Sequence, residues 1–253
     1  MNPSYDEIVK ANSMRGNEIK KTPLIYSPTF SELTGSEIFL KAEFRQRTGS
    51  FKIRGAYFKI KSLSDEEKKH GVVAASAGNH AQGMAFASSL EKISCTIVMP
   101  KNASPAKVAA TRGYGANVIL EGTNYDESSA KAKEIAKETG ATMIHAFDDP
   151  QIIAAHGVIG LEILDDLPDV DEIYLPIGGG GLAAGTLIAI KEEPHIADNS
   201  NNNIKLFKAN FFDRVLNFIF WSRYFYLVNR LHKLISLTIP QIISIIKFCY
   251  QSI

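Results

Sequence analysis

Lys52 stands where a Thr-Gly-Ser turn, residues 48–50, gives way to a helical pattern. The positive end of a helix dipole disfavours the charged form of a lysine in the first turn. An amine that is partly neutral can form a Schiff base with a carbonyl compound. The alternative is that Lys52 and Arg54 are ordinary solvated cations on a helix surface, and Lys52 taken alone favours that simpler interpretation.

A second small-residue turn, Ser76-Ala-Gly-Asn-His80, also leads from an apolar strand pattern into a helical one. The Ser76 hydroxyl, the Asn79 amide and free backbone N–H groups there can bind a carboxylate or another anion. The Asn79 amide also suits a ring hydroxyl. Ordinary helix capping by Ser76 or Asn79 is the alternative, and His80 alone is better explained as a surface or packed residue.

The third turn contains four consecutive glycines, Gly178 to Gly181, between a strand pattern and a helical pattern over 182–191. Consecutive glycines let backbone N–H groups surround a phosphate at a helix N-terminus. A flexible linker fits poorly between two apolar elements. A dinucleotide fingerprint, Gly178-x-Gly180-x-x-Ala183, matches loosely, but Asp198 at the required spacing has no strand before it. The sequence therefore favours a phosphate-binding turn.

Predicted strands and helices, which must position these turns, alternate along the chain. Short apolar runs predict strands, and the segments between them have helical periodicity, as in 126–138. This alternation predicts a doubly wound α/β protein with a largely parallel sheet, in which ligands bind at the carboxyl ends of the strands. The predicted strands are 38–42, 71–75, 95–99, 117–120, 143–146 and 173–176.

Composition excludes several classes of protein and divides the chain in two. With 45% hydrophobic residues, 22% charged residues, two cysteines and a net charge of +1, the chain is no disordered protein, disulfide scaffold or obvious nucleic-acid or membrane binder. All 18 glycines precede residue 202, and residues 202–253 hold seven basic residues but one acid, Asp213. The polar run 198–203 at this boundary predicts a loop or linker.

Together, the three turns supply an imine-forming amine, a carboxylate site and a phosphate site, which an enzyme needs to hold pyridoxal 5′-phosphate and an amino acid. Their motifs are Thr48-Gly-Ser-Phe-Lys-Ile-Arg-Gly-Ala56, Ser76-Ala-Gly-Asn-His-Ala-Gln-Gly83 and Gly178-Gly-Gly-Gly-Leu-Ala-Ala-Gly185. In these motifs and their order, residues 1–197 resemble the threonine dehydratase, serine dehydratase and serine racemase group of fold-type II pyridoxal phosphate enzymes.

The resemblance implies a role for each residue of the motifs. Lys52 would form the Schiff base with the cofactor and act as the catalytic residue, and Phe51 would pack on the cofactor ring. Ser76, Asn79 and His80 would bind the substrate carboxylate, and Asn79 would also contact the ring hydroxyl. The phosphate would be held by Gly178, Gly179, Gly180, Gly181 and Leu182. No resident metal site is expected.

The resemblance also implies a fold and a reaction. The fold is a two-lobed α/β architecture like the tryptophan synthase β-subunit, with residues 1–69 and 149–201 as an incomplete large domain and 70–148 as a small mobile domain. The reaction is β-elimination from L-threonine or L-serine, giving a 2-oxo acid and ammonia. Serine racemase-type activity is the alternative, but Ala77 stands where racemases of the group carry a proton-transferring Ser. A cytoplasmic homo-oligomer with a small amino acid substrate is expected.

Residues 202–253 do not resemble the group. We expect them to mark a truncated or mis-spliced member, with basic amphipathic helices such as 211–233 that pack on the protein as the next alternative and a membrane-surface helix as the last. The group's further strands and the Ser that contacts the pyridine nitrogen have no match in the chain. The chain would then bind cofactor weakly, or serve only as an inactive binding or regulatory subunit.

Overall fold

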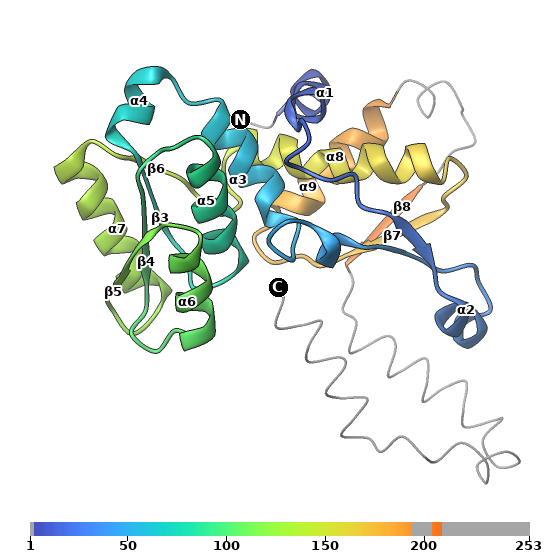
Figure 1. Ribbon diagram of the computed structural model, residues 1–253. Helices are drawn as coiled ribbons and strands as arrows, with labels where there is room; N and C mark the ends of the chain where they lie inside the picture. The colour runs from blue at the N-terminus through green and yellow to red at the C-terminus, as the bar shows by residue number, and fades with distance from the viewer. Residues whose placement is uncertain (1–2, 194–203, 209–253) are drawn as a thin grey trace, which may run out of the picture.

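Four parallel strands form the largest sheet of the protein, seen in a computed structural model that describes residues 3–193 and 204–208 (Figure 1). In spatial order they are β5 (Asn117–Leu120), β4 (Cys95–Met99), β3 (Val72–Ala75) and β6 (Thr142–Met143). Val72 lies opposite both Cys95 and Thr142, so β3 is an inner strand. We call this sheet and the helices packed on it the central lobe.

Helices cover both faces of the central sheet. They are α5 (Asn79–Leu90), α6 (Pro105–Gly113) and α7 (Tyr125–Thr139), while α4 (Asp65–His70) leads into β3. Val72 and Ala74 point into a core shared with α5 and α6, whereas Val73 and Ala75 pack with Ala132 of α7. All four residues of β3 are buried, as expected for a parallel strand with two covered faces.

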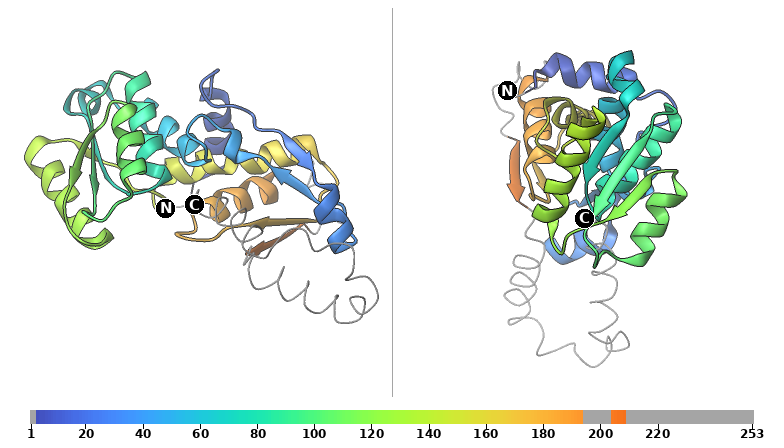
Figure 2. Two further views of the ribbon diagram at one scale, coloured as in Figure 1. Left: turned by 60° about the horizontal axis from the view of Figure 1, so that its bottom comes forward. Right: turned by 90° about the vertical axis from the view of Figure 1, so that its left-hand side faces the viewer.

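The remaining elements form a second lobe, which we call the flanking lobe, beside the first (Figures 1 and 2). Its two sheets have two strands each: antiparallel β1–β2 and parallel β7–β8. These strands are β1 (Leu24–Tyr26), β2 (Phe39–Lys41), β7 (Glu172–Leu175) and β8 (Lys205–Lys208). The helices are α1 (Tyr5–Met14), α2 (Pro28–Thr34), the 3-10 turn η1 (Glu43–Arg45), α8 (Pro150–Asp166) and α9 (Gly181–Glu192).

Helix α3 (Lys52–Lys61) lies between the lobes and packs on α5 and on α8. A Cβ atom on Gly55 would stand 2.8 Å from Nε2 of the fully buried His156, so α3 and α8 meet closely there. Helices α8 and α9 are equally close, since a Cβ atom on Gly185 would stand 2.2 Å from the Ile153 carbonyl oxygen. Small residues at these crossings bring the starts of α3 and α9 toward one another.

A buried ionic cluster fixes α3 to the flanking lobe. The Arg54 side chain is 1% exposed and forms two-pronged pairs with Glu43 and Glu162, with N–O distances of 2.8–2.9 Å. Burial opposes the guanidinium charge, but hydrogen bonds and charges of these carboxylates outweigh it and raise the pKa of Arg54. Lys41 and Arg15 also contact Glu162, at 2.9 and 3.3 Å. The interpretation of Arg54 as a solvated cation is therefore wrong.

The predicted strands 95–99 and 117–120 coincide with β4 and β5, and 38–42, 71–75 and 173–176 overlap β2, β3 and β7. The strand predicted at 143–146 is wrong over most of its length, because β6 ends at Met143 and the chain turns. Strand β8 lies beyond the composition boundary at residue 202 and pairs with β7. The predicted linker 198–203 and helix 211–233 lie outside the described residues. No helix among the described residues is long and apolar enough to cross a membrane.

Candidate active site

Lys52 is the first residue of α3, and its Nζ donates a hydrogen bond to the Ala146 carbonyl oxygen over 2.9 Å. Burial lowers the pKa of Lys52 to about 8. The Nζ atom also lies 5.1 Å from the centre of the Phe51 ring. A substantial fraction of this amine is neutral at mildly alkaline pH, so it can act as a nucleophile or base. The predicted reactive lysine thus has the environment its chemistry needs, with burial as the main physical cause.

The Phe51 ring also contacts the ring of His156. The two rings meet edge to face, with their centres 4.9 Å apart at an interplanar angle of 75°. Both ring nitrogens of His156 are buried without a hydrogen-bond partner among the described residues. Burial, with a smaller contribution from the Lys52 charge, holds the pKa of His156 well below its usual range. His156 is therefore a neutral residue packed against Phe51, and the sequence analysis did not single it out.

The second predicted turn brings the start of α5 against the start of α3. A Cβ atom on Gly83 would lie 3.2–3.3 Å from backbone atoms of Lys52 and Ile53. Asn79 and His80 are 9% and 3% exposed, and the Ser76 hydroxyl accepts a hydrogen bond from the Gly78 N–H over 3.2 Å. Burial, with a contribution from the Lys52 charge, lowers the pKa of His80 to about 3. His80 is thus a packed, neutral residue beside the lysine.

The glycine turn joins β7 to α9 and has the backbone form of an anion site. Gly180 adopts a left-handed conformation with φ of 87°, and no side chain caps the first N–H groups of α9. Gly178 and Gly179 are exposed, whereas Leu182 packs with Phe51 against one apolar cluster. The free N–H groups of this turn can therefore receive a phosphate.

Residues 145–148 connect the lysine with the glycine turn. Ala146 supplies the carbonyl that accepts from Lys52, and a Cβ atom on Gly179 would stand 2.2 Å from the Phe147 ring. Sequence reasoning missed this segment. The signal that could have found it is its position directly after β6, since ligand sites of parallel sheets gather at carboxyl ends of strands.

Comparison with known proteins agrees with this geometry. The sequence model of the family described as "Pyridoxal-phosphate dependent enzyme" matches residues 16–210. The chain belongs to this family. The match extends nine residues past the boundary at 201 inferred from composition, and it includes β8.

Individual relatives of this family member carry related descriptions. L-threonine ammonia-lyase of Thermotoga maritima is 54% identical over 188 residues, which are 74% of this chain and 47% of that protein. The catabolic L-threonine dehydratase TdcB of Escherichia coli K12 is 52% identical over 188 residues, 74% of this chain and 57% of its own length. Among solved structures, maize serine racemase superposes with a TM-score of 0.76 at 34% identity, covering 81% of this chain and 61% of that one. The chain spans about half the length of the curated relatives it matches.

The predictions of an α/β fold-type II architecture and of pyridoxal phosphate as the cofactor are confirmed. The residues of this family member fit that group. Lys52 offers a half-buried amine of lowered pKa, Phe51 a ring, and the glycine turn a cradle in which a Cβ at Gly179 would meet Phe147. When bound, pyridoxal phosphate supplies an electron sink for charge that develops at the Cα atom of an amino acid.

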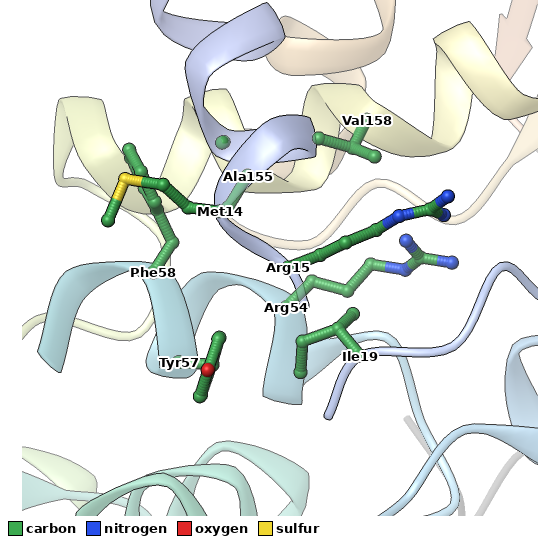
Figure 3. A pocket seen from close by; sticks show the side chains of 9 residues that line it. Met14, Arg15, Ile19, Arg54, Tyr57, Phe58, Ala155 and Val158 are labelled. Atoms are coloured by element: carbon green, nitrogen blue, oxygen red, sulfur yellow. The ribbon is translucent and has the colours of Figure 1, made fainter. Parts of the chain in front are cut away.

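The small cavity in Figure 3 is separate from this site. It lies between α1, α3 and α8, and its polar end is formed by the guanidinium groups of Arg15 and Arg54, away from Met14 and Phe58. Because Arg54 is engaged by Glu43 and Glu162, this cavity belongs to the buried ionic cluster. Lys52 does not line this cavity, although it begins the same helix.

Proposed function

We propose that the whole protein catalyses pyridoxal phosphate-dependent deamination of hydroxy amino acids, converting L-threonine to 2-oxobutanoate and ammonia or L-serine to pyruvate and ammonia. The observation that carries the proposal is the half-buried Lys52 amine, with its pKa lowered to about 8, at the junction of α3, α5 and the glycine turn. The threonine ammonia-lyase and threonine dehydratase descriptions of the relatives support the choice of substrate.

Each motif has a role in this proposal. The backbone N–H groups of Gly178 to Gly181 and Leu182 hold the cofactor phosphate, while Phe51 and Asn79 position its ring. Ser76, Asn79 and His80 bind the substrate carboxylate; His80 is neutral at physiological pH, so it can only do so as a hydrogen-bond partner. The neutral Lys52 amine takes the proton from the substrate Cα atom, and the β-hydroxyl takes up a proton as it leaves as water. The enamine that remains is hydrolysed to the 2-oxo acid and ammonia.

Elimination is favoured over racemisation by the residue after Ser76. A racemase needs a proton donor on each face of the reacting carbon, and the methyl group of Ala77 cannot supply one. We expect L-serine incubations to yield pyruvate with little D-serine, measured by chiral chromatography. Formation of D-serine at a rate comparable to that of pyruvate would contradict this expectation, and Ala77→Ser is the variant expected to increase it.

The domain organisation, assembly and location complete the proposal. Residues 1–69 and 149–201 would form the large domain and residues 70–148 a small domain that moves over the substrate; of the basic stretch 202–253, residues 205–208 pair with β7 as strand β8. Exposed apolar side chains of the flanking lobe, such as Tyr26, Leu40 and Phe44, support contacts with further protein, as in a homo-oligomer. A cytoplasmic location fits the unpaired Cys95.

An inactive binding or regulatory subunit is the second candidate. Purification of the 253-residue chain with added pyridoxal phosphate separates the two candidates. The enzyme predicts the visible absorption of a lysine imine and ammonia release from L-threonine, both lost in Lys52→Ala and kept in the matched Lys101→Ala variant. A folded protein that stays colourless and inactive at saturating cofactor would contradict the enzymatic proposal for this chain.

A further inference from the structure

His145 organises the turn that follows β6. Its ring nitrogen Nδ1 accepts hydrogen bonds from the backbone N–H groups of Asp148, over 3.0 Å, and of Phe147, over 3.4 Å. An imidazole nitrogen accepts only when it carries no proton, so the single proton of the neutral ring is on Nε2. The His145 and Phe147 rings also meet edge to face, with centres 4.6 Å apart at 82°.

The turn built by His145 touches both halves of the candidate active site. The Ala146 carbonyl, inside the turn, accepts the hydrogen bond from Lys52 Nζ over 2.9 Å. Phe147 fills the space above the glycine turn, since Cβ atoms on Gly179 and Gly181 would stand 2.2 Å from its ring and 2.6 Å from its carbonyl oxygen. The His145 ring therefore holds the backbone segment that contacts both Lys52 and the glycine turn.

This arrangement is not needed to begin the following helix. Helix α8 has its own N-terminal cap, because an Asp149 side-chain oxygen accepts from the N–H groups of Gln151 and Ile152. A Lys59–Asp149 ion pair of 2.8 Å ties the same residue to α3. The two hydrogen bonds to His145 thus serve the turn at 145–148 itself.

We propose that His145 is a positioning residue: its unprotonated Nδ1 holds the 145–148 turn, and through Ala146 and Phe147 this turn aligns the Lys52 amine with the glycine turn that receives the cofactor phosphate. The proposal rests on the proposed function for the identity of the cofactor. The alignment itself is a property of the protein without cofactor.

Two variants of the full chain separate the acceptor from the ring. In His145→Asn, the side-chain oxygen can accept from N–H groups two and three residues on, as asparagine does in turns and helix caps. His145→Phe keeps an aromatic ring against Phe147 but has no acceptor. Because two hydrogen bonds are lost, we expect His145→Phe to weaken pyridoxal phosphate binding about tenfold or more, and His145→Asn to stay within about threefold of the unchanged protein.

A second readout needs no cofactor. Amide hydrogen exchange at Phe147 and Asp148 should be about tenfold or more faster in His145→Phe and close to the unchanged protein in His145→Asn. If the unchanged chain bound no pyridoxal phosphate, the proposed function would fail, and the exchange rates would still decide the role of His145.

Three results would overturn the proposal. The first is exchange and cofactor affinity that are unchanged in His145→Phe. The second is equal impairment of His145→Asn and His145→Phe, which would assign the effect to the imidazole ring. The third is loss of folding in both His145→Phe and His145→Ala, because that would give His145 a general structural role.

Discussion

The central and flanking lobes are stabilised in different ways. The central sheet has four strands with helices on both faces, and its largest buried side chains are apolar, such as Ile97 and Met99. The flanking lobe has two sheets of two strands each and is fixed to α3 by a buried cluster of charges. Large exposed apolar side chains follow this division among the described residues: Leu120 and Tyr125 belong to the central lobe, and Val9, Tyr26, Leu33, Leu40, Phe44, Tyr174, Ile177 and Leu187 to the flanking lobe.

This difference teaches where single substitutions will matter. The central lobe is stabilised by apolar surface buried in many separate contacts. A single substitution on its surface therefore lowers the free energy of unfolding only slightly. A buried ion pair that loses one partner leaves the other charge uncompensated, and a side chain placed on a glycine at a close contact clashes with its neighbour. Either change is therefore costly to stability. The start of α3 and the glycine turn depend on such ion pairs and close glycine contacts. We therefore expect single substitutions there to destabilise the protein more than substitutions in the central lobe.

The largest effect is expected from breaking the buried cluster. Arg54→Met leaves Glu43 and Glu162 without their two-pronged partner and should lower the free energy of unfolding by about 3–5 kcal/mol. The matched change in the central lobe, Lys101→Met, removes an exposed pair with Glu121 and should cost less than about 1 kcal/mol. Urea unfolding of both variants measures the difference, and equal losses would break the comparison between the lobes.

An intermediate effect is expected in the glycine turn. Gly179→Ala places a methyl group against the Phe147 ring and should cost about 1–3 kcal/mol, with weaker cofactor binding. Gly178→Ala in the same turn and Gly113→Ala in the central lobe meet no atom within 4 Å, so each should be neutral or slightly stabilising. Thermal unfolding with and without pyridoxal phosphate compares the three variants. A Gly179→Ala variant as stable and as well bound as Gly178→Ala would show that the contact with Phe147 yields without cost.

The smallest effect at neutral pH concerns the boundary of the lobes, because it develops only as the solution is acidified. His156 and His80 are buried and neutral, with folded pKa values lowered below the usual 6.5, for His80 to about 3. Below pH 6.5 the unfolded chain binds protons that the folded chain does not, so stability falls as pH falls from 6.5 toward the folded pKa values. Each histidine should contribute a slope of about 1.4 kcal/mol per pH unit.

His156→Gln tests this slope in one lobe and His80→Gln in the other. Each change should remove about half of the acid dependence between pH 6.5 and 5 while leaving the dependence above pH 7 as it was. Urea unfolding across this pH range provides the measurement. If the slope of the unfolding free energy against pH were unchanged in both variants, other groups would cause the acid dependence. The boundary between the lobes would then be no more acid-sensitive than the rest of the protein.

Much of the fold could be predicted because its signals are local. The strands β4 and β5 were predicted at their observed bounds, and two of the three predicted turns follow the parallel strands β3 and β7, whereas the turn before α3 comes after the antiparallel strand β2. The short strand β1 could not be found, because three residues show no periodicity. The burial of Arg54 and the packing of His156 against Phe51 arise from residues about 100 positions apart, which no local pattern records.

The pairing of β3 with β6 also bears on how the chain is made. Val72 pairs with Cys95 and with Thr142, so every strand of the central sheet lies within one uninterrupted stretch, whereas the flanking lobe combines segments from before and after it. During synthesis from the N-terminus, the central sheet can close before the glycine turn has left the ribosome. We expect α3 to pack on α5 first, and to complete its packing only after α8 has been synthesised.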